Sequence, residues 1–226
     1  MLKAAIFKKG IQTVLNWIYP PQCLACGEVC DSGSLLCIYC GESVQVNDPS
    51  MRCPDCFSSH ACRVHDKNIN KIAFTLDSSI GVMGILRTRF SQVNGYYLDQ
   101  VLGAIMYAYL KSVLRWPNPD MVVSLPVSNF KSAFLRYDPQ YLLAKQLSKY
   151  FQIKCLDPFF YKGGLVPWYK NKYVWSNKKI LVIGMDSSYN SYIEAIKQLR
   201  YFGTKANYAL GLFDPVDKSV TKRSAP

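Results

Sequence analysis

The feature that most constrains the fold is a cluster of cysteines near the N-terminus. Eight of the nine cysteines lie between Cys23 and Cys62, and both histidines, His60 and His65, lie in or beside that stretch. Six of these cysteines form three C-x-x-C pairs. Two thiolates separated by two residues can sit on one tight turn, and two such turns can surround a tetrahedral zinc ion. We therefore expect the first third of the chain to fold around metal.

The first two pairs predict a four-thiolate zinc site. Its expected ligands are Cys23, Cys26, Cys37 and Cys40. A glycine, Gly27 or Gly41, follows each pair and suits a knuckle in which the chain turns sharply with positive φ. Disulfide bonds in an exported domain are the alternative, but no secretory signal is visible and the repeated spacing favours metal. Because protein ligands fill all four positions of such a cage, its expected role is structural.

A second zinc site is predicted from the residues that follow. Its expected ligands are Cys53, Cys56, Cys62 and His65. His60 competes with His65 for the fourth position, Cys30 is left over, and the two sites could interleave their ligands. A set of unbound thiols is the alternative, so the sequence favours one zinc ion and leaves the second open. Cys155 stands alone and is expected to be a small, buried apolar residue.

The formal net charge of +12 is unevenly placed along the chain. Residues 1–66 carry five Lys and Arg against six Asp and Glu, whereas residues 67–226 carry twenty-two against nine. A basic body favours polyanionic partners such as nucleic acid or phosphorylated ligands. Dispersed lysines are also typical of an ordinary solvated surface, so this alternative stays open.

Residues 1–20 are predicted to form an amphipathic helix. Their apolar positions recur at helical spacing, are interrupted by Lys8-Lys9-Gly10 and end before Pro20-Pro21, unlike a secretory signal. We expect this helix to pack on its own protein rather than to attach to a membrane surface. No run of about 18 uncharged apolar residues is present, so no membrane span is expected. Clustered, reduced cysteines favour a cytoplasmic location.

The rest of the chain is predicted to be an α/β body over residues 69–215 and a disordered tail over 216–226. Apolar runs typical of buried parallel strands lie at 121–125, 179–184 and 206–212, with a strand or short turn at 72–74. Helical periodicity lies at 96–114, 141–150 and 191–201. This alternation of strands and helices indicates a parallel sheet.

The loop that follows the strand at 179–184 is the candidate ligand site of this sheet. Ligands of parallel sheets bind at the carboxyl ends of strands, where the free N–H groups of a helix N-terminus attract phosphate. Small polar side chains could cradle a phosphate there, although a plain turn with a serine N-cap explains the same composition. The loop comprises Asp186, Ser187, Ser188, Tyr189, Asn190 and Ser191.

Several motifs together resemble one protein family. Pro20-Pro21-Gln22-Cys23-Leu-Ala-Cys26-Gly27 is followed by Cys37-Ile-Tyr-Cys40 and then by Cys53-Pro-Asp-Cys56. In the body, Val122-Val-Ser-Leu-Pro126-Val127 is similar to a V-P-V-P-L strand, and Arg136-Tyr-Asp-Pro-Gln140 is similar to an R-G-F-N-Q segment. In this order the motifs resemble the ComF family, competence-associated proteins that join a zinc ribbon to a type I phosphoribosyltransferase-like domain.

The resemblance implies a zinc-ribbon module over residues 21–68 and a phosphoribosyltransferase-like domain over 69–215. An active member would bind phosphoribosyl pyrophosphate with Mg²⁺, and paired acids after an apolar strand would hold the ribose hydroxyls. Here Gly184 and Met185 stand in place of those acids. Two missing charge-assisted hydrogen bonds, each worth about 1.5–3 kcal/mol, would lower the sugar affinity by several orders of magnitude. We therefore expect a scaffold whose transferase chemistry is largely or wholly lost.

Three functions follow as expectations. The first is an accessory role in DNA uptake or nucleic-acid handling, through single-stranded DNA or a partner in the uptake machinery. Aromatic residues interleaved with lysines fit such contacts, since bases stack on rings while lysines meet phosphates. The candidate residues are Trp168, Lys170, Lys172 and Trp175. The alternatives are an active phosphoribosyltransferase centred on Asp186 and its neighbours, and a protein-interaction scaffold without activity.

Overall fold

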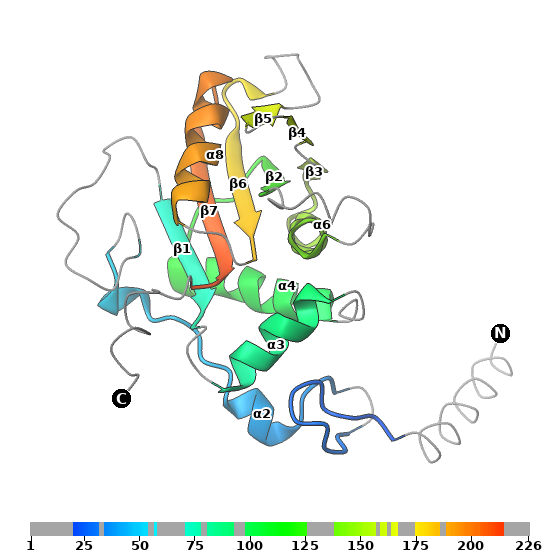
Figure 1. Cartoon of the computed structure of the whole chain (residues 1–226). Coiled ribbons are helices and arrows are strands. Elements are labelled where there is room, and N and C mark those ends of the chain that lie inside the picture. The colour runs from blue at the N-terminus through cyan, green and yellow to red at the C-terminus, as the bar shows by residue number, and fades with distance from the viewer. Residues whose placement is uncertain are drawn as a thin grey trace, which may run out of the picture.

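The body is a five-stranded parallel sheet with helices on its faces, and the cysteine-rich segment lies at one end of it (Figure 1). The predicted helix at 1–20, apart from Pro20, and the tail at 216–226 lie outside the described residues. This computed structural model describes residues 20–31, 34–53, 57, 71–77, 81–92, 98–125, 138–156, 159–161, 164–166, 175–185 and 189–214.

The strand order in the sheet is β1-β7-β6-β2-β3. The strands are β1 Lys71–Leu76, β2 Met121–Ser124, β3 Lys154–Leu156, β6 Lys179–Gly184 and β7 Ala206–Phe213. All four neighbouring pairs are parallel, and β1, β2 and β6 are buried along almost their whole length, as expected for a sheet covered on both faces. The four predicted strands are therefore confirmed, and 72–74 is a strand rather than a turn.

In the described part of the chain, five helical segments accompany the sheet. They are α3 Gly81–Ser91, α4 Leu98–Ala108, the π-helical turn η3 Tyr109–Leu114, α6 Pro139–Phe151 and α8 Tyr189–Tyr201. The three predicted helices are confirmed. The carboxylate of Asp138 caps α6 by accepting from the backbone N–H groups of Gln140 and Tyr141 at 2.9 and 3.2 Å. Such a cap satisfies donors that the first turn of a helix otherwise leaves unpaired.

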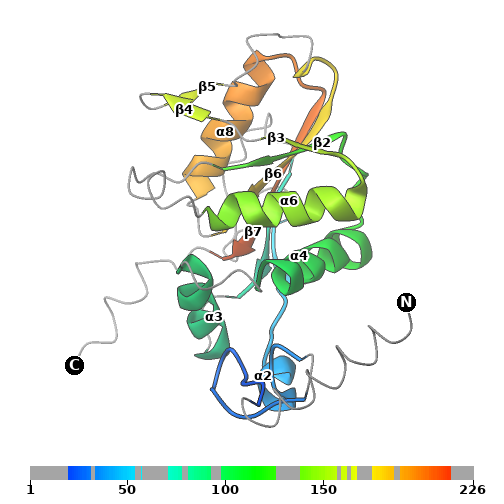
Figure 2. The ribbon, with the colours of Figure 1, turned by 90° about the vertical axis from the view of Figure 1, so that its right-hand side faces the viewer.

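Chain direction explains which face each helix covers. The crossovers from β2 to β3 and from β6 to β7 run in opposite directions across the sheet, so right-handed connections place α6 and α8 on opposite faces. The contacts agree, because α6 packs on β2, β6 and α4, while α8 packs on β7 (Figures 1 and 2). The carboxyl ends of the strands point toward α3 and the cysteine-rich segment (Figure 1).

A polar junction joins the cysteine-rich segment to the sheet. Asn47 is buried, and its backbone N–H and side-chain amide donate to the carbonyls of Thr75 and Phe74 on β1 at 2.9 and 3.0 Å. The Tyr109 hydroxyl donates to the Asn47 carbonyl at 2.8 Å. Arg52 donates to the carboxylate of Asp214 at 2.7 Å, just after β7. Residues far apart in the sequence thus fix the segment to the carboxyl end of the sheet.

Arg52→Ala is expected to destabilise the protein by about 2 kcal/mol at neutral pH, because it leaves a largely desolvated carboxylate without its charged donor. Burial already raises the pKa of Asp214, and Arg52 opposes that rise. Without Arg52, the pKa of Asp214 in the folded state lies further above its pKa in the unfolded state. The folded state then favours the protonated carboxyl of Asp214. The protonated carboxyl stabilises the folded protein at low pH, and this contribution is lost as the pH rises through the folded-state pKa.

The cost of Arg52→Ala should therefore shrink as the pH falls from about 7.5 toward about 5. Urea unfolding at both pH values, with the exposed Lys145→Ala as the control, measures this. An equal or larger cost at acidic pH would show that the ion pair does not stabilise this junction.

Candidate metal centre

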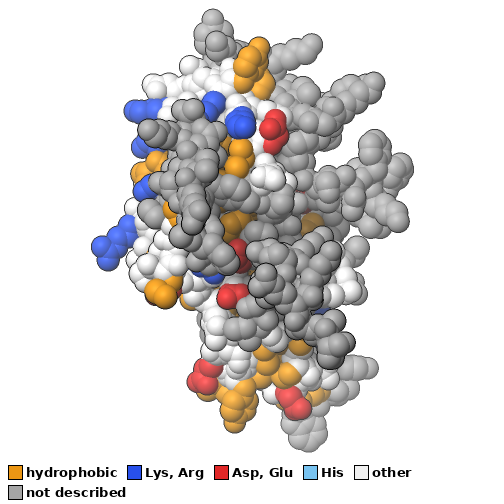
Figure 3. Space-filling model, turned by 60° about the vertical axis from the view of Figure 1, so that its left-hand side comes forward, with side chains coloured by type: hydrophobic (Ala, Val, Ile, Leu, Met, Phe, Trp, Pro, Cys, Tyr) orange, Lys and Arg blue, Asp and Glu red, His pale blue; other side chains and the backbone are white. Residues whose placement is uncertain are grey.

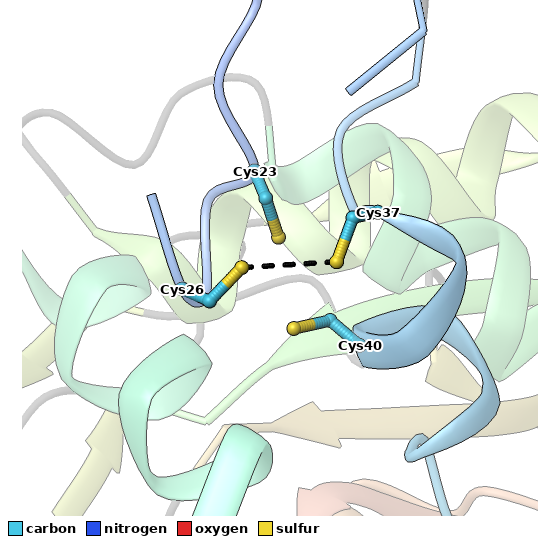
Figure 4. A group of neighbouring side chains, drawn as sticks. All are labelled: Cys23, Cys26, Cys37 and Cys40. Atoms are coloured by element: carbon cyan, nitrogen blue, oxygen red, sulfur yellow. Dashed lines mark hydrogen bonds between the residues drawn. The ribbon is translucent and has the colours of Figure 1, made fainter. Parts of the chain in front are cut away.

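Four cysteine thiols converge between two short segments of the chain. The Sγ atoms of Cys23, Cys26, Cys37 and Cys40 all lie within 4.8 Å of one another (Figure 4). The Sγ atoms of Cys26 and Cys37 are 3.7 Å apart. A zinc ion bound by four thiolates at about 2.3 Å requires sulfurs about 3.8 Å apart, as the edges of a tetrahedron. These four residues form a cluster that could hold a metal ion such as zinc.

The first two thiols lie on a tight turn. The turn is closed by an antiparallel bridge between Gln22 and Val29, and the backbone N–H of Gly27 donates to the carbonyl of Cys23 at 3.0 Å. Gly27 has φ +84°, so the expected positive φ is confirmed at this knuckle. The backbone N–H of Ala25 points toward Cys23 Sγ at 3.4 Å. The turn thus directs both a thiol and an N–H group toward the cluster.

The other two thiols lie on a helical turn instead. Cys37 occupies the N-cap of α2 Ile38–Glu42, and Cys40 lies within that helix. The expectation of positive φ at Gly41 is wrong, because Gly41 belongs to the helix and its backbone N–H donates to the Cys37 carbonyl at 2.8 Å. Residues three apart on a helix lie on the same face. Two different backbone geometries therefore bring the two thiols of a C-x-x-C pair together.

The packing around the cluster is apolar and involves few residues. Cys23 and Cys40 are buried together with Ala25, and Leu36 and Val82 pack against them. Val82 belongs to α3, so the cluster adjoins the first helix of the body (Figure 2). Cys26 is exposed at the rim. Such a limited core needs a cross-link of some kind to hold two segments together.

The thiols differ in their readiness to ionise. Burial raises the pKa of Cys23, but backbone hydrogen bonds from Cys26, Cys37 and Ala25 outweigh it and lower the value to about 6. Burial and the neighbouring thiols raise the pKa of Cys40 to about 12. Four thiolates this close repel one another unless a cation lies among them, which is the electrostatic character of a metal site. With every position supplied by protein, such a site is structural rather than catalytic.

Cys30 lies near this cluster but outside it. Its thiol donates to the carbonyl of Ser34, with an Sγ–O distance of 3.3 Å, and lies 3.6 Å from that of Pro21. Cys155 in β3 is half-buried rather than fully buried as expected, and it packs against the main core. Of the second predicted site only Cys53 is described, and it is half-buried. Its predicted partners Cys56, Cys62 and His65, with the competing His60, lie outside the described residues, so that site stays a prediction.

The candidate phosphate loop is described only at its edges. Asp186, Ser187 and Ser188 lie outside the described residues. Tyr189 begins α8, where Asn190 and Ser191 are exposed in the first turn. The structure thus places the loop between the carboxyl end of β6 and the start of a helix, as the sequence predicts, and leaves phosphate binding there a prediction.

The glycine that ends β6 faces a buried ring that the sequence did not single out. A Cβ atom added at Gly184 would lie 2.3 Å from the hydroxyl oxygen of Tyr192 and 2.8 Å from its Cζ. Tyr192 is 0% exposed, and its ring also meets Phe74 edge-on at 5.7 Å. The side-chain space above Gly184 is therefore filled by an aromatic residue of α8. A glycine at the end of an apolar strand was the only sequence signal of this contact.

One of the residues predicted to contact nucleic acid is buried. Trp175 is 1% exposed and belongs to the main core, so it offers no ring face to a base, and its predicted role is wrong. Composition alone could not distinguish a core ring from a surface ring in this segment. Trp168, Lys170 and Lys172 lie outside the described residues.

Comparisons with known proteins leave the family open. No family model matches the chain, and no curated protein matches it. Among the described residues, no helix has the length and apolar character needed to cross a membrane.

Proposed function

We propose that this chain is a zinc-stabilised protein related to the ComF family, with a phosphoribosyltransferase-like body that binds partners rather than catalyses a reaction. The four-cysteine cluster and the parallel sheet support the first part of the proposal. An accessory role in DNA uptake or other nucleic-acid handling follows from the family resemblance and the basic body.

The contact between Gly184 and Tyr192 carries the non-catalytic part of the proposal. Aligned on the family pattern, Gly184 stands where one of the paired acids would hold the ribose hydroxyls. Here even a single added carbon would overlap the Tyr192 hydroxyl at 2.3 Å. Because protein interiors are close-packed, a carboxylate cannot be placed there without displacing the ring. Tyr192 thus fills the space that the side chain of an acid would need. This is expected when packed core residues replace a binding site.

Calorimetric titration with phosphoribosyl pyrophosphate and Mg²⁺ tests this proposal. We expect no binding with a Kd below about 1 mM, since the charge-assisted hydrogen bonds to the ribose are absent. Inorganic pyrophosphate in the same buffer is the control for phosphate binding alone. Micromolar, Mg²⁺-dependent binding of the sugar, or pyrophosphate release with a nucleobase, would instead favour an active transferase that uses Asp186, Ser187 and Ser188.

A further inference from the structure

Basic side chains gather at the end of the sheet opposite to the metal cluster. This amino edge is where β3, β6 and β7 begin and where α8 ends. Its Lys and Arg residues include Lys154, Lys178, Lys179, Lys197, Arg200 and Lys205. In Figure 3 most visible Lys and Arg side chains lie in the upper half, toward this edge, whereas most visible Asp and Glu lie lower. On this face, charge is thus unevenly placed, which net composition does not reveal.

Backbone contacts hold these lysines in neighbouring positions. The backbone N–H of Lys205 donates to the carbonyl of Lys178 at 2.9 Å, and Lys179 pairs with Ala206. Lys154 pairs with Met121, which is also level with Ile180 on β6. Adjacent strands are about 4.8 Å apart, so these lysine backbones lie within a few strand spacings of one another along one edge. The sheet therefore fixes the backbone positions from which these lysine side chains extend.

Little acidic charge opposes this row. Lys154, Lys178, Lys197 and Lys205 are exposed, and none forms a salt bridge within the described part of the chain. Of the acids near this row in the described residues, Asp120 accepts from the backbone N–H of Lys179 at 2.8 Å, and Glu194 accepts from Gln198 at 3.1 Å. The edge therefore presents a positive potential to solvent, as a polyanion site requires.

An exposed aromatic ring lies at the same edge, at the end of α8. Tyr201, the last residue of α8, is 84% exposed. Its ring is held edge-on by Phe202, with the ring centroids 5.7 Å apart. Tyr201 follows Arg200 directly and precedes Lys205 by one short turn. A ring presented beside backbone-binding cations is the arrangement on which the bases of a single strand stack.

The opposite end carries more acidic residues. Asp77 and Asp214 follow the carboxyl ends of β1 and β7, and the metal module carries Glu28, Asp31 and Glu42. A duplex would use the lysines but would leave an exposed tyrosine without a stacking partner. The combination of cations and ring at one edge therefore favours a single strand.

We propose that the amino edge is a binding surface for single-stranded nucleic acid, on which Tyr201 stacks against a base while Lys178, Lys205 and their neighbours contact phosphates. This surface lies away from the carboxyl edge, where the sheet would hold a sugar phosphate. The inference deepens the proposed binding role and rests on it, since it names the ligand class and the residues.

Fluorescence anisotropy with a labelled oligothymidylate of about 20 nucleotides tests the surface. The double variant Lys178→Gln with Lys205→Gln should weaken binding about tenfold at about 50 mM salt. It should also reduce the magnitude of the slope of log K against log salt by about 1.4, because each lost phosphate contact removes about 0.7. The matched control is Arg89→Gln with Lys145→Gln, which removes the same charge from exposed positions elsewhere. It should change the affinity less than twofold.

The ring is tested separately. Tyr201→Ala should weaken binding about tenfold with an unchanged salt slope, since it removes stacking and not charge. Tyr39→Ala is its matched control, because Tyr39 is 78% exposed on α2 near the metal cluster. Circular dichroism and zinc content should be unchanged in all four variants.

The outcomes separate the surface from the proposed function. The native chain could bind the oligonucleotide while the test and control variants weaken that binding equally. This result would overturn the proposed surface and leave the proposed nucleic-acid role standing. Absence of binding at low salt, together with lysine-dependent binding to vesicles containing about 30% phosphatidylserine, would overturn the nucleic-acid assignment and indicate a membrane-surface site. Absence of binding to both probes would overturn the surface and the nucleic-acid role together.

Discussion

Cys40→Ser should lose the zinc ion of the first site and destabilise residues 20–53 by several kcal/mol. Cys40 is buried among three other thiols whose Sγ atoms all lie within 4.8 Å, so its loss leaves an incomplete cage. Binding of structural zinc contributes on the order of 10 kcal/mol to the folding of small modules, because the unfolded chain has no preformed site. The surrounding apolar core consists of few residues and cannot replace that contribution.

Cys30→Ser is the matched control for this variant. Cys30 lies beside the cluster, but its thiol donates to the Ser34 carbonyl and is not one of the four convergent ligands. It should retain the metal and lose little stability. Thermal unfolding with and without chelator, together with limited proteolysis of residues 20–53, distinguishes the two variants. Equal behaviour of Cys40→Ser and Cys30→Ser would contradict the assignment of ligands.

Gly184→Ala should destabilise the protein by about 3 kcal/mol, which is unusually large for a single added methyl group. The new Cβ would lie 2.3 Å from the Tyr192 hydroxyl oxygen, and both residues are enclosed by the sheet and α8. The ring must leave its position or β6 must shift, and either change disturbs close packing. Removing the hydroxyl with Tyr192→Phe in the same chain should restore part of the loss, since Cζ remains 2.8 Å away.

Gly84→Ala provides the control for this substitution. Gly84 lies within α3, and a Cβ there would meet no atom within 4 Å. Alanine should instead stabilise the helix by about 0.8 kcal/mol, because glycine is the poorer helix former. Urea unfolding measures all the variants. A stability of Gly184→Ala equal to that of the native protein would show that the position is open and would remove the packing argument against a sugar site.

The sequence predicted the sheet because its central strands are nearly continuous apolar runs. Residues 179–184 are a strand with the predicted bounds, since no other short structure buries six such residues on two faces. The strands β3, β4 Phe159–Tyr161 and β5 Gly164–Val166 were not predicted. Three residues are too few to show a period, so only their neighbours in space define them as strands.

The metal centre was predictable because it depends on local spacing. Cys23 and Cys26, like Cys37 and Cys40, need only a turn or a helical face to bring their thiols together. The spacing did not reveal which of the two geometries is used, and so Gly41 was expected in the wrong conformation.

Contacts between distant residues were not predictable. The burial of Trp175, the ring of Tyr192 above Gly184 and the pairing of Arg52 with Asp214 each depend on how the elements pack. Net charge suggested a polyanion partner, but only the topology shows that the lysines before β6 and β7 share one edge. These features belong to tertiary structure, which sequence periodicity does not encode.

The most direct test of a zinc-held fold is native mass spectrometry of the intact chain, with metal analysis of the same sample. We predict at least one zinc ion per native chain, one ion fewer in Cys40→Ser and no change in Cys30→Ser. A native chain that remains folded and monodisperse without any bound metal would contradict the central claim that the four-cysteine cluster holds this part of the fold.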